Sequence, residues 1–356
     1  MISSHLSLLS FGTTIFSLAL LVSFLLTKGA YRFALRKNVL DIPNDRSSHS
    51  TPTPRGGGLG IVLTFLPALL LLKHLGAISI AIFAALLGGG TLIALVGWMD
   101  DLKPIAARWR FMIHAIAAGW AIYWIGGVPA LTFGQYSIRL GFFGDLLTFL
   151  GILWMINLYN FMDGIDGLAA GEALSMGLAG GFLLVLGGGS NLAWVAILLA
   201  ACCAGFLFLN WPPAKIFMGD IGSGFIGYCL AIIWTQGAKS DPVAFWIWAI
   251  LLSIFIADAT FTLISRVMKK EPWYQAHRTH AYQQLVQMGE SHLSVTGLIL
   301  LFNLFLLFPF AWYIMDHRFQ AFLGTAFLYV ALFIGWFFID RKYASFKRND
   351  FQKQTD

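Results

Sequence analysis

The sequence predicts an all-α polytopic membrane protein, and three observations lead to that prediction. Of the 356 residues, 58% are hydrophobic and 11% are charged, and the mean hydropathy is +0.75. A soluble domain carries roughly 25% charged residues, so this chain cannot cover a water-facing surface of ordinary size. The 32 phenylalanines and 13 tryptophans are typical of spans that place aromatic side chains at the membrane interface.

The apolar stretches set the expected architecture, because a spanning helix needs roughly 20 mostly apolar residues. With that length the sequence predicts eleven spans, at 5–28, 56–73, 76–98, 112–128, 145–160, 171–187, 192–209, 221–238, 243–265, 293–315 and 320–340. The first span lacks a basic start and a clear small-residue cleavage site, so we expect it to be retained. One integral-membrane domain is expected over 1–340, followed by a polar cytoplasmic tail over 341–356.

Lysine and arginine predict the orientation of the chain. All but four of the 23 belong with the odd-numbered loops or the tail, and the exceptions are Lys73, Arg139, Lys239 and Arg318. Because cytoplasmic loops collect basic residues, we expect the N-terminus outside and the C-terminus in the cytoplasm. The net charge of +6 is therefore a topology signal, with attraction to anionic lipid or phosphorylated substrates as its second meaning. No nucleic-acid partner is expected.

Polar residues gather in the loops that are expected on the cytoplasmic face, at 41–58, 99–103, 157–171, 210–224 and 276–284. A pore or a carrier with a midplane site would place its ionisable groups within the helices instead. Five polar loops on one face predict a functional site there. On the opposite face, the segment 129–144 is interpreted as a short β-hairpin around Gly134 and Gln135.

Two groups of acids stand out in these loops. Asp100 and Asp101 end a predicted span, where paired carboxylates bind a hard cation or position a nucleophile. Helix termination by two solvated acids is the alternative. Asp163 and Asp166 follow Asn160, and if the helix continues through Asp163, then Asn160 and Asp163 share one face and point at one ligand. A simple turn explains the glycines beside these acids but not the asparagine before them.

Asp220 lies between glycines at the start of another predicted span. A carboxylate there suits Mg²⁺, and nearby backbone N–H groups suit phosphate. An N-cap aspartate is the alternative interpretation. Lys215 offers a cation for phosphate and Asn210 an amide for a base edge. Phe217 offers a face on which a base can stack, although an interfacial aromatic residue needs no ligand to explain it.

The last polar loop contains His277, Arg278 and His280. These residues suit a pyrophosphate, because arginine binds phosphate in a bidentate manner and histidine donates hydrogen bonds. Zinc is disfavoured because no cysteine offers a third ligand. Arg55 precedes three glycines that let the backbone approach a phosphate, without the spacing of a P-loop. Asp258, inside a predicted span, is either a functional acid or a brace for a neighbouring helix.

Together these motifs resemble the polyprenyl-phosphate N-acetylhexosamine-1-phosphate transferase superfamily (glycosyl transferase family 4), which includes muramoyl-pentapeptide transferase and enzymes that initiate O-antigen. The matching motifs are Asp100-Asp101, Asn160-Phe-Met-Asp163-Gly-Ile-Asp166-Gly, Phe217-Met-Gly-Asp220-x-Gly-Ser and His277-Arg-x-His280, in order over residues 41–284. Each motif is short, but their joint match is specific. The muramoyl-pentapeptide enzyme has three consecutive histidines where this chain has His-Arg-x-His. That departure favours an O-antigen or related initiator.

The resemblance implies transfer of N-acetylhexosamine-1-phosphate from a UDP-sugar to undecaprenyl phosphate, with UMP as the second product and Mg²⁺ or Mn²⁺ as cofactor. The predicted catalytic residues are Asp100, Asp101, His277 and His280, and the predicted metal ligand is Asp220. The predicted substrate-binding residues are Arg55, Asn160, Asp163, Asp166, Asn210, Lys215, Phe217 and Arg278. We expect UDP-N-acetylglucosamine or a deoxy relative as donor, and the bacterial inner membrane as the location.

Two other classes of function compete with a transferase. A secondary transporter of a nucleotide-linked or phosphorylated solute explains the spans and the basic face, but not the one-sided acids or the lack of internal repeats. An intramembrane hydrolase of lipid diphosphates is a third interpretation. The sequence leaves open whether the chain forms a homodimer, and which glycan its product enters.

Overall fold

A computed structural model describes residues 2–43, 51–272 and 277–355, and most of them are helical. The helices of the first half are α1 (Ile2–Lys37), α2 (Gly58–His74), α3 (Ile80–Ala84), the π-helical turn η1 (Ala85–Gly89), α4 (Gly90–Leu102), α5 (Ala107–Ile125), α6 (Phe142–Met162) and α7 (Leu168–Leu186). Those of the second half are α8 (Ser190–Asn210), α9 (Asp220–Ser240), α10 (Ala244–Leu251), α11 (Ser253–Met268), α12 (Ala281–Gln287), α13 (His292–Phe302), η2 (Asn303–Leu307), α14 (Phe308–Asp316), η3 (Arg318–Gln320) and α15 (Ala321–Thr355).

Eight helices of the described residues are long and apolar enough to cross a membrane. The pair α10 and α11, bent by 73° where they meet, makes a ninth candidate. The polytopic helical membrane class is thus confirmed, whereas the count of eleven spans is not. The helix α2 has only 17 residues, and the apolar run of α5 begins after the cations Arg108 and Arg110.

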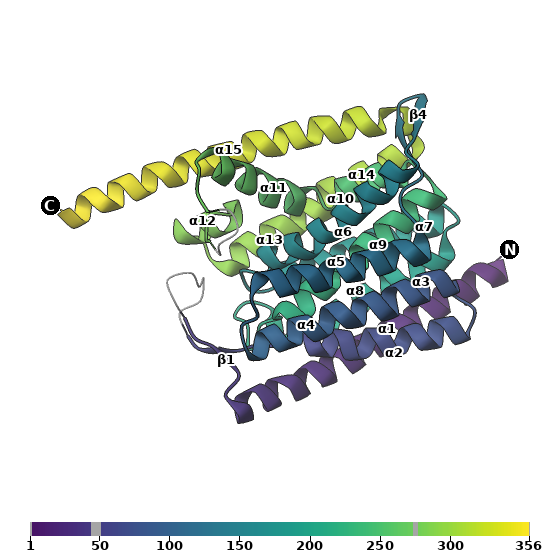
Figure 1. The fold of residues 1–356 in the computed structure, drawn as a ribbon, viewed down its shortest axis with the longest axis horizontal. Coiled ribbons are helices and arrows are strands. Elements are labelled where there is room, and N and C mark those ends of the chain that lie inside the picture. The colour runs from purple at the N-terminus through teal and green to yellow at the C-terminus, as the bar shows by residue number, and fades with distance from the viewer. Residues whose placement is uncertain (1, 44–50, 273–276, 356) are drawn as a thin grey trace.

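The long helices lie side by side, so their connections collect at two ends of the bundle (Figure 1). One end carries β1 (Leu40–Asp41), β2 (Thr53–Pro54) and α12, and we call it the α12 end. The other carries the hairpin of β3 (Ala130–Phe133) and β4 (Tyr136–Arg139), and we call it the hairpin end. The N-terminus lies at the hairpin end and the C-terminus beyond the α12 end (Figure 1).

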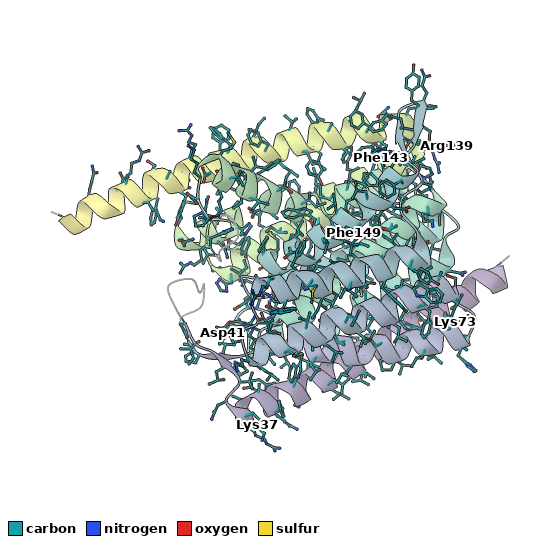
Figure 2. The ribbon with its side chains drawn as sticks, viewed as in Figure 1. Lys37, Asp41, Lys73, Arg139, Phe143 and Phe149 are labelled. Carbon is teal, nitrogen blue, oxygen red and sulfur yellow. The ribbon has the colours of Figure 1, made fainter. Side chains whose placement is uncertain are left out.

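Charged and apolar side chains divide along the same axis. Lys37 and Asp41 lie at the α12 end, and Lys73 and Arg139 lie at the hairpin end (Figure 2). The flanks between them expose large apolar side chains, such as Phe327, which is 76% exposed. Exposed apolar flanks between two polar ends are what a bilayer-embedded bundle requires.

The predicted hairpin at 129–144 is confirmed. Strands β3 and β4 pair antiparallel, with Phe133 opposite Tyr136 across the turn at Gly134 and Gln135. The indole N–H of Trp246 donates to the carbonyl of Thr132 over 2.7 Å, which ties the hairpin to the start of α10.

Glycines let three helices approach closely at the α12 end. A Cβ at Gly97 in α4 would lie 2.5 Å from the backbone carbonyl of Asp220, the first residue of α9. A Cβ at Gly58 in α2 would lie 2.4 Å from the Cα atom of Gly222. Small residues allow such helix contacts in membranes. Helices α2, α4 and α9 are therefore held backbone to backbone where α4 ends and α9 begins.

Candidate active site

The end of α4 is joined to the start of α9 by Asp101. Its carboxylate accepts the backbone N–H groups of Asp220, at 2.9 Å, and Ile221, at 3.2 Å. The side chain of Asp101 is completely buried. Asp101 thus satisfies N–H groups that a helix start leaves without intrahelical partners. The alternative interpretation of Asp220 as an N-cap is wrong, because Gly219 is the N-cap, Asp220 is the first helical residue, and its carboxylate accepts from Arg55 and Arg110.

Gly219 makes this junction sterically feasible. Its φ of +78° lies in the region that residues with a Cβ rarely adopt. A Cβ at this position would also lie 2.4 Å from a carboxylate oxygen of Asp101. The glycine before Asp220 is therefore required by both the backbone conformation and the space that Asp101 fills.

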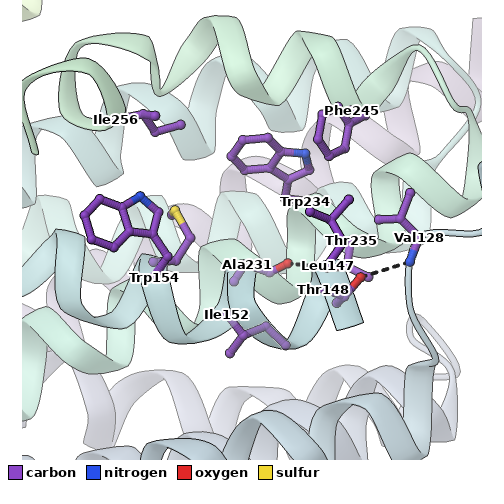
Figure 3. A pocket seen from close by; sticks show the side chains of 12 residues that line it. Val128, Leu147, Thr148, Ile152, Trp154, Ala231, Trp234, Thr235, Phe245 and Ile256 are labelled. Atoms are coloured by element: carbon purple, nitrogen blue, oxygen red, sulfur yellow. Dashed lines mark hydrogen bonds between the residues drawn. The ribbon is translucent and has the colours of Figure 1, made fainter. Parts of the chain in front are cut away.

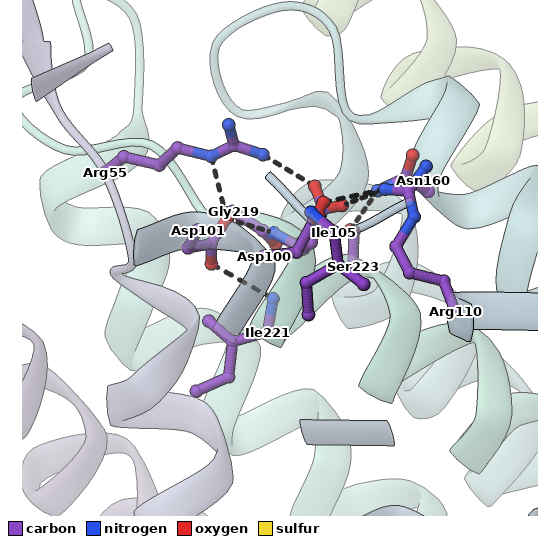
Figure 4. A network of polar contacts seen from close by, with 10 residues as sticks. Arg55, Asp100, Asp101, Ile105, Arg110, Asn160, Gly219, Ile221 and Ser223 are labelled. Atoms are coloured by element: carbon purple, nitrogen blue, oxygen red, sulfur yellow. Dashed lines mark hydrogen bonds and ion pairs between the residues drawn. The ribbon is translucent and has the colours of Figure 1, made fainter. Parts of the chain in front are cut away.

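Two arginines neutralise the acids at this junction (Figure 4). Arg55 contacts Asp101 through Nε at 2.8 Å and Asp220 through Nη2 at 2.6 Å. Arg110 contacts Asp100 at 2.7 Å and Asp220 at 3.0 Å, both through Nη1. Burial lowers the pKa of Arg55, but the carboxylates of Asp101 and Asp220 outweigh burial and raise that pKa above its ordinary value.

Arg110 is the site residue that the motifs did not identify. It lies in the first turn of α5, ten residues after Asp100, and sequence reasoning used it only as a topology signal. One local signal was present: a cation at the start of an apolar helix, directly after a pair of acids. That signal does not say which acids the cation meets, since Asp220 is 110 residues away in the chain.

Asn160 and Asp163 lie beside this cluster, from the end of α6. The amide of Asn160 donates to the hydroxyl of Ser223 in α9 at 3.2 Å. The condition for a shared helical face is not met, because α6 ends at Met162 and Asp163 has a non-helical ψ of 49°. Burial, reinforced by the acids nearby, raises the pKa of Asp163 well above its ordinary value, although Arg55 acts in the opposite direction.

Asp166 and Asn210 hold loops together instead of facing the acid cluster. Asp166 accepts the backbone N–H of Ala214 at 3.0 Å and lies 3.2 Å from Nδ1 of His292. Asn210 is buried; its side-chain oxygen accepts the N–H of Gly167 and its amide donates to the carbonyl of Ile216, both at 3.0 Å. Asp166 and Asn210 therefore fix the 210–217 loop against the 163–167 turn.

A cleft with a volume of about 730 Å³ opens at the α12 end between these loops and α13. Three predicted substrate-binding residues line it: Asp166, Phe217 and Arg278. Thr51 and Thr53, which precede Arg55 in the chain, also line it. Lys215 is exposed and does not line this cleft. A concave site with an aromatic face, a cation and several polar groups suits a small anionic ligand with a ring.

The histidine loop packs on the turn after α6. The rings of His277 and His280 stack with centroids 4.9 Å apart, and Phe161 stacks on His280 at 5.9 Å. His280 is buried, with Nδ1 3.6 Å from Asp258. Burial, and then the neighbouring His280 and Arg266, lower the pKa of His277 to about 4, so its ring is neutral at pH 7.

Asp258 is a brace, one of the two interpretations that its sequence left open. Its carboxylate accepts the backbone N–H groups of Ala281, at 2.8 Å, and Tyr282, at 3.2 Å. These are the first residues of α12, so Asp258 stabilises the start of that helix from α11. The consequence is that His280, directly before α12, has a fixed position.

The acid cluster suits a hard divalent cation. Mg²⁺ usually takes one or two protein carboxylates and fills its remaining positions with water and phosphate oxygens. Asp100 and Asp220 provide carboxylate oxygens next to the solvent-facing arginines. Within the described residues no three His, Cys, Asp or Glu side chains form a complete metal site. Mg²⁺ here would take its remaining ligands from water and from the oxygens of a bound phosphate compound.

A second, apolar pocket of about 170 Å³ lies among α6, α9 and the α10–α11 bend (Figure 3). Its threonines are occupied, because Thr148 accepts the N–H of Val128 and Thr235 donates to the carbonyl of Ala231. The rest of the lining is dominated by apolar and aromatic groups such as Trp154 and Ile256. It can hold an apolar group but offers no charge for phosphate chemistry.

The chain is similar in sequence to a known family and to several of its members. The sequence model of a family described as glycosyl transferase family 4 matches residues 83–238. A probable undecaprenyl-phosphate N-acetylglucosaminyl 1-phosphate transferase of Bacillus subtilis is 32% identical, over 78% of each chain. A decaprenyl-phosphate N-acetylglucosaminephosphotransferase of Mycobacterium tuberculosis is 30% identical, over 80% of this chain and 78% of the relative. An undecaprenyl-phosphate alpha-N-acetylglucosaminyl 1-phosphate transferase of Yersinia pestis is 30% identical, over 73% of each chain.

The helical membrane fold, the acid cluster and these matches define the class of protein. The chain belongs to glycosyl transferase family 4, the polyprenyl-phosphate N-acetylhexosamine-1-phosphate transferases, and the family predicted from its motifs is confirmed.

Proposed function

We propose that the protein transfers N-acetylglucosamine-1-phosphate from UDP-N-acetylglucosamine to undecaprenyl phosphate, giving undecaprenyl-diphospho-N-acetylglucosamine and UMP. The observation that carries the proposal is the cluster of Asp100, Asp101 and Asp220 with Arg55 and Arg110 beside a polar cleft at one end of the bundle. The names of the relatives from Bacillus and Yersinia, which specify undecaprenyl phosphate and N-acetylglucosamine, support this choice of substrates.

In the proposed reaction, an oxygen of the lipid phosphate attacks the phosphorus that carries the sugar. A new phosphorus–oxygen bond forms, the bond from that phosphorus to the bridging oxygen of UMP breaks, and UMP leaves with its electron pair. The second pKa of a phosphate monoester is near 6, so the acceptor is mainly a dianion at pH 7 and needs no strong base. Such transfer depends on positioning and charge neutralisation. Mg²⁺, when bound, neutralises charge on the diphosphate oxygens.

The cleft and the acid cluster suggest roles for several of the predicted site residues. Phe217 presents an aromatic ring on which uracil can stack, and Arg278 presents a guanidinium for the diphosphate. His277, neutral at pH 7, can donate one hydrogen bond to a sugar or phosphate oxygen without adding charge. Asp220 and Asp100 serve the metal side. Lys215, exposed at the end of the 210–217 loop, is left for long-range attraction of the anionic donor.

The decisive experiment mixes purified protein with undecaprenyl phosphate, Mg²⁺ and a panel of UDP-N-acetylhexosamines. We expect UMP release only when lipid phosphate and donor are both present, with UDP-N-acetylglucosamine preferred. Uptake of the UDP-sugar into vesicles without UMP release would indicate a transporter instead. Release of inorganic phosphate from a lipid diphosphate would indicate a hydrolase.

The orientation follows from the same proposal. We propose that the α12 end faces the cytoplasm, where UDP-sugars are made, and that the product starts an O-antigen or related surface glycan from the bacterial inner membrane. The basic residues of the loops at that end support this orientation. Cysteines at Gln135 and Lys239 should react with an impermeant reagent added from the periplasm, and cysteines at Asp163 and His277 should not. The reverse pattern would overturn the orientation.

A further inference from the structure

Both carboxylate oxygens of Asp220 are occupied by arginines. One accepts from Arg55 at 2.6 Å and the other from Arg110 at 3.0 Å. Each arginine also holds a second acid, Asp101 or Asp100. In the view of Figure 4, Arg55 and Arg110 lie on opposite sides of Asp100. The positive charge that a metal would bring to Asp220 is thus supplied by side chains of the chain itself.

The arginines are better placed to move than the acids are. Their side chains are 32% and 35% exposed, whereas Asp101 is completely buried and Asp220 is 15% exposed. Arg55 follows the short strand β2, and Arg110 lies in the first turn of α5, so neither belongs to the α4–α9 junction that fixes the acids. Rotation of either side chain leaves that junction intact.

The charges of this cluster favour binding of a divalent cation and a diphosphate together over binding of the cation alone. Three carboxylates and two guanidinium groups leave a net charge of −1. A divalent cation on Asp220 displaces the arginines, and without an anion nearby they are left beside a positive charge. A diphosphate supplies the missing partner, because guanidinium binds phosphate oxygens as well as carboxylate oxygens.

We propose that Arg55 and Arg110 are exchangeable counter-ions: they hold Asp220 in the ligand-free protein and pass to the diphosphate of the nucleotide-sugar when Asp220 binds a divalent cation. This inference rests on the proposed function and deepens it. It makes cation binding and nucleotide binding mutually dependent. Coupling between two ligands of one protein typically changes each affinity by about 5- to 150-fold.

The test uses Mn²⁺ as the probe and measures its binding by electron paramagnetic resonance, with and without UDP-N-acetylglucosamine. In the wild type, the nucleotide-sugar should tighten Mn²⁺ binding by at least about fivefold. Arg55→Gln and Arg110→Gln should each tighten binding of Mn²⁺ alone, by about tenfold, because a competing cation is removed. In the same variants the nucleotide-sugar should have less effect on Mn²⁺ affinity, and UMP release should slow.

Arg108→Gln is the matched control. Arg108 lies on the same turn of α5, is exposed, and stacks on Trp109 at 5.6 Å instead of pairing with the acids. Its replacement removes the same charge from nearly the same place and should change Mn²⁺ affinity little. If a glutamine variant is not monodisperse, the lysine variant replaces it; this keeps the charge but not the bidentate donor, so Mn²⁺ affinity should stay near wild type while coupling falls.

Two results would overturn the counter-ion role: unchanged or weaker Mn²⁺ binding in the glutamine variants, or no effect of the nucleotide-sugar on Mn²⁺ binding by a wild type that releases UMP. Failure of the proposed function looks different. In that case the wild type releases no UMP with any donor, while the Mn²⁺ titrations without nucleotide still decide whether the arginines compete with a cation.

Discussion

The two halves of the candidate site use aspartate in different ways. On the α4–α9 side, Asp220 is paired with the side chains of Arg55 and Arg110, and Asp100 pairs with Arg110 while its other oxygen accepts the backbone N–H of Ile105 at 2.6 Å. On the loop side, Asp166 and Asp258 accept backbone N–H groups, and each also lies within 3.6 Å of a histidine Nδ1 atom. A charged side-chain partner can be exchanged for a ligand without unfolding the chain, whereas a backbone partner cannot. The partner of an acid therefore separates candidate chemistry from architecture better than the acid's place in a motif does.

Asp101, like Asp100, has both kinds of partner, because it pairs with Arg55 and accepts two backbone N–H groups of α9. We interpret it mainly as a positioning residue. It holds the start of α9, and hence Asp220, in place.

The largest effect is expected at Asp220. Asp220→Asn keeps the size of the side chain but removes the charge that a metal and both arginines require. We expect turnover to fall by several orders of magnitude, in line with the loss of several kcal/mol of transition-state neutralisation. Folding should survive, because Asp101, not Asp220, caps α9. Turnover and Mg²⁺ dependence of purified, monodisperse protein provide the measurement.

Near-normal turnover of Asp220→Asn at ordinary Mg²⁺ would move the metal to Asp100 or Asp101. Asp145→Asn is a suitable control at the hairpin end, where Asp145 accepts the N–H of Gly127. It removes one carboxylate far from the cluster and should leave the dependence on Mg²⁺ unchanged.

The next effect separates Asp163 from Asp166, neighbours in one motif. Asp163 makes no side-chain hydrogen bond or ion pair within the described residues, and burial opposes its charge. Asp163→Asn should therefore keep or raise stability while turnover falls by about 10²-fold, an effect typical of a lost electrostatic contact. Asp166→Ala should instead lower the free energy of unfolding by about 1–3 kcal/mol, since the N–H of Ala214 loses its acceptor.

Thermal unfolding and turnover, measured on both variants, test this contrast. Equal losses of turnover with no change in stability for Asp166→Ala would show that Asp166 acts on the substrate directly. That result would mean that a backbone partner does not mark an acid as structural.

A smaller effect is expected at Glu172, an acid buried in α7 away from both halves. Its carboxylate accepts from Asn303 at 2.5 Å, and its other oxygen has no partner in the described structure. Glu172→Gln keeps the shape and removes any charge, so we expect stability within about 1 kcal/mol of wild type and unchanged turnover per folded molecule. A loss of turnover in folded Glu172→Gln would show that an acid outside the cluster takes part in the reaction.

The sequence allowed the membrane class, the positions of most helices and the gathering of polar loops at one end to be predicted. These features depend on composition and on apolar length, which are local properties. The sequence alone does not predict which groups the acids bind. Asp101 finds its N–H donors 119 and 120 residues later, and Asn210 bonds the turn at Gly167, 43 residues earlier. No local pattern specifies such pairs.

The end of α6 is another feature that the local sequence does not predict. The three-residue spacing of Asn160 and Asp163 would place them on one face only in a continuous helix, and the chain turns after Met162. The following Gly164 has tight surroundings, because a Cβ there would lie 2.1 Å from the hydroxyl of Tyr282. Docking of α12 against this turn, which depends on Asp258, competes with helix continuation.

The smallest effect concerns pH and compares His277 with Asp163. The pKa of His277 is lowered to about 4, so between pH 6.5 and 4 the unfolded chain binds a proton that the folded protein does not. His277 therefore makes the protein less stable as the pH falls through this range. The raised pKa of Asp163 has the opposite effect on stability, since the folded protein keeps that proton to a higher pH than the unfolded chain does.

The melting temperature at pH 5 minus that at pH 7.5 should be about 2 °C higher in His277→Gln than in the wild type. The expected effect is small because His277 is half-buried and screened by solvent. Asp163→Asn should shift the same difference the other way. Melting temperatures of the three proteins at both pH values, in one detergent and buffer series, provide the measurement, and equal shifts in all three would show that neither group changes its proton affinity on folding.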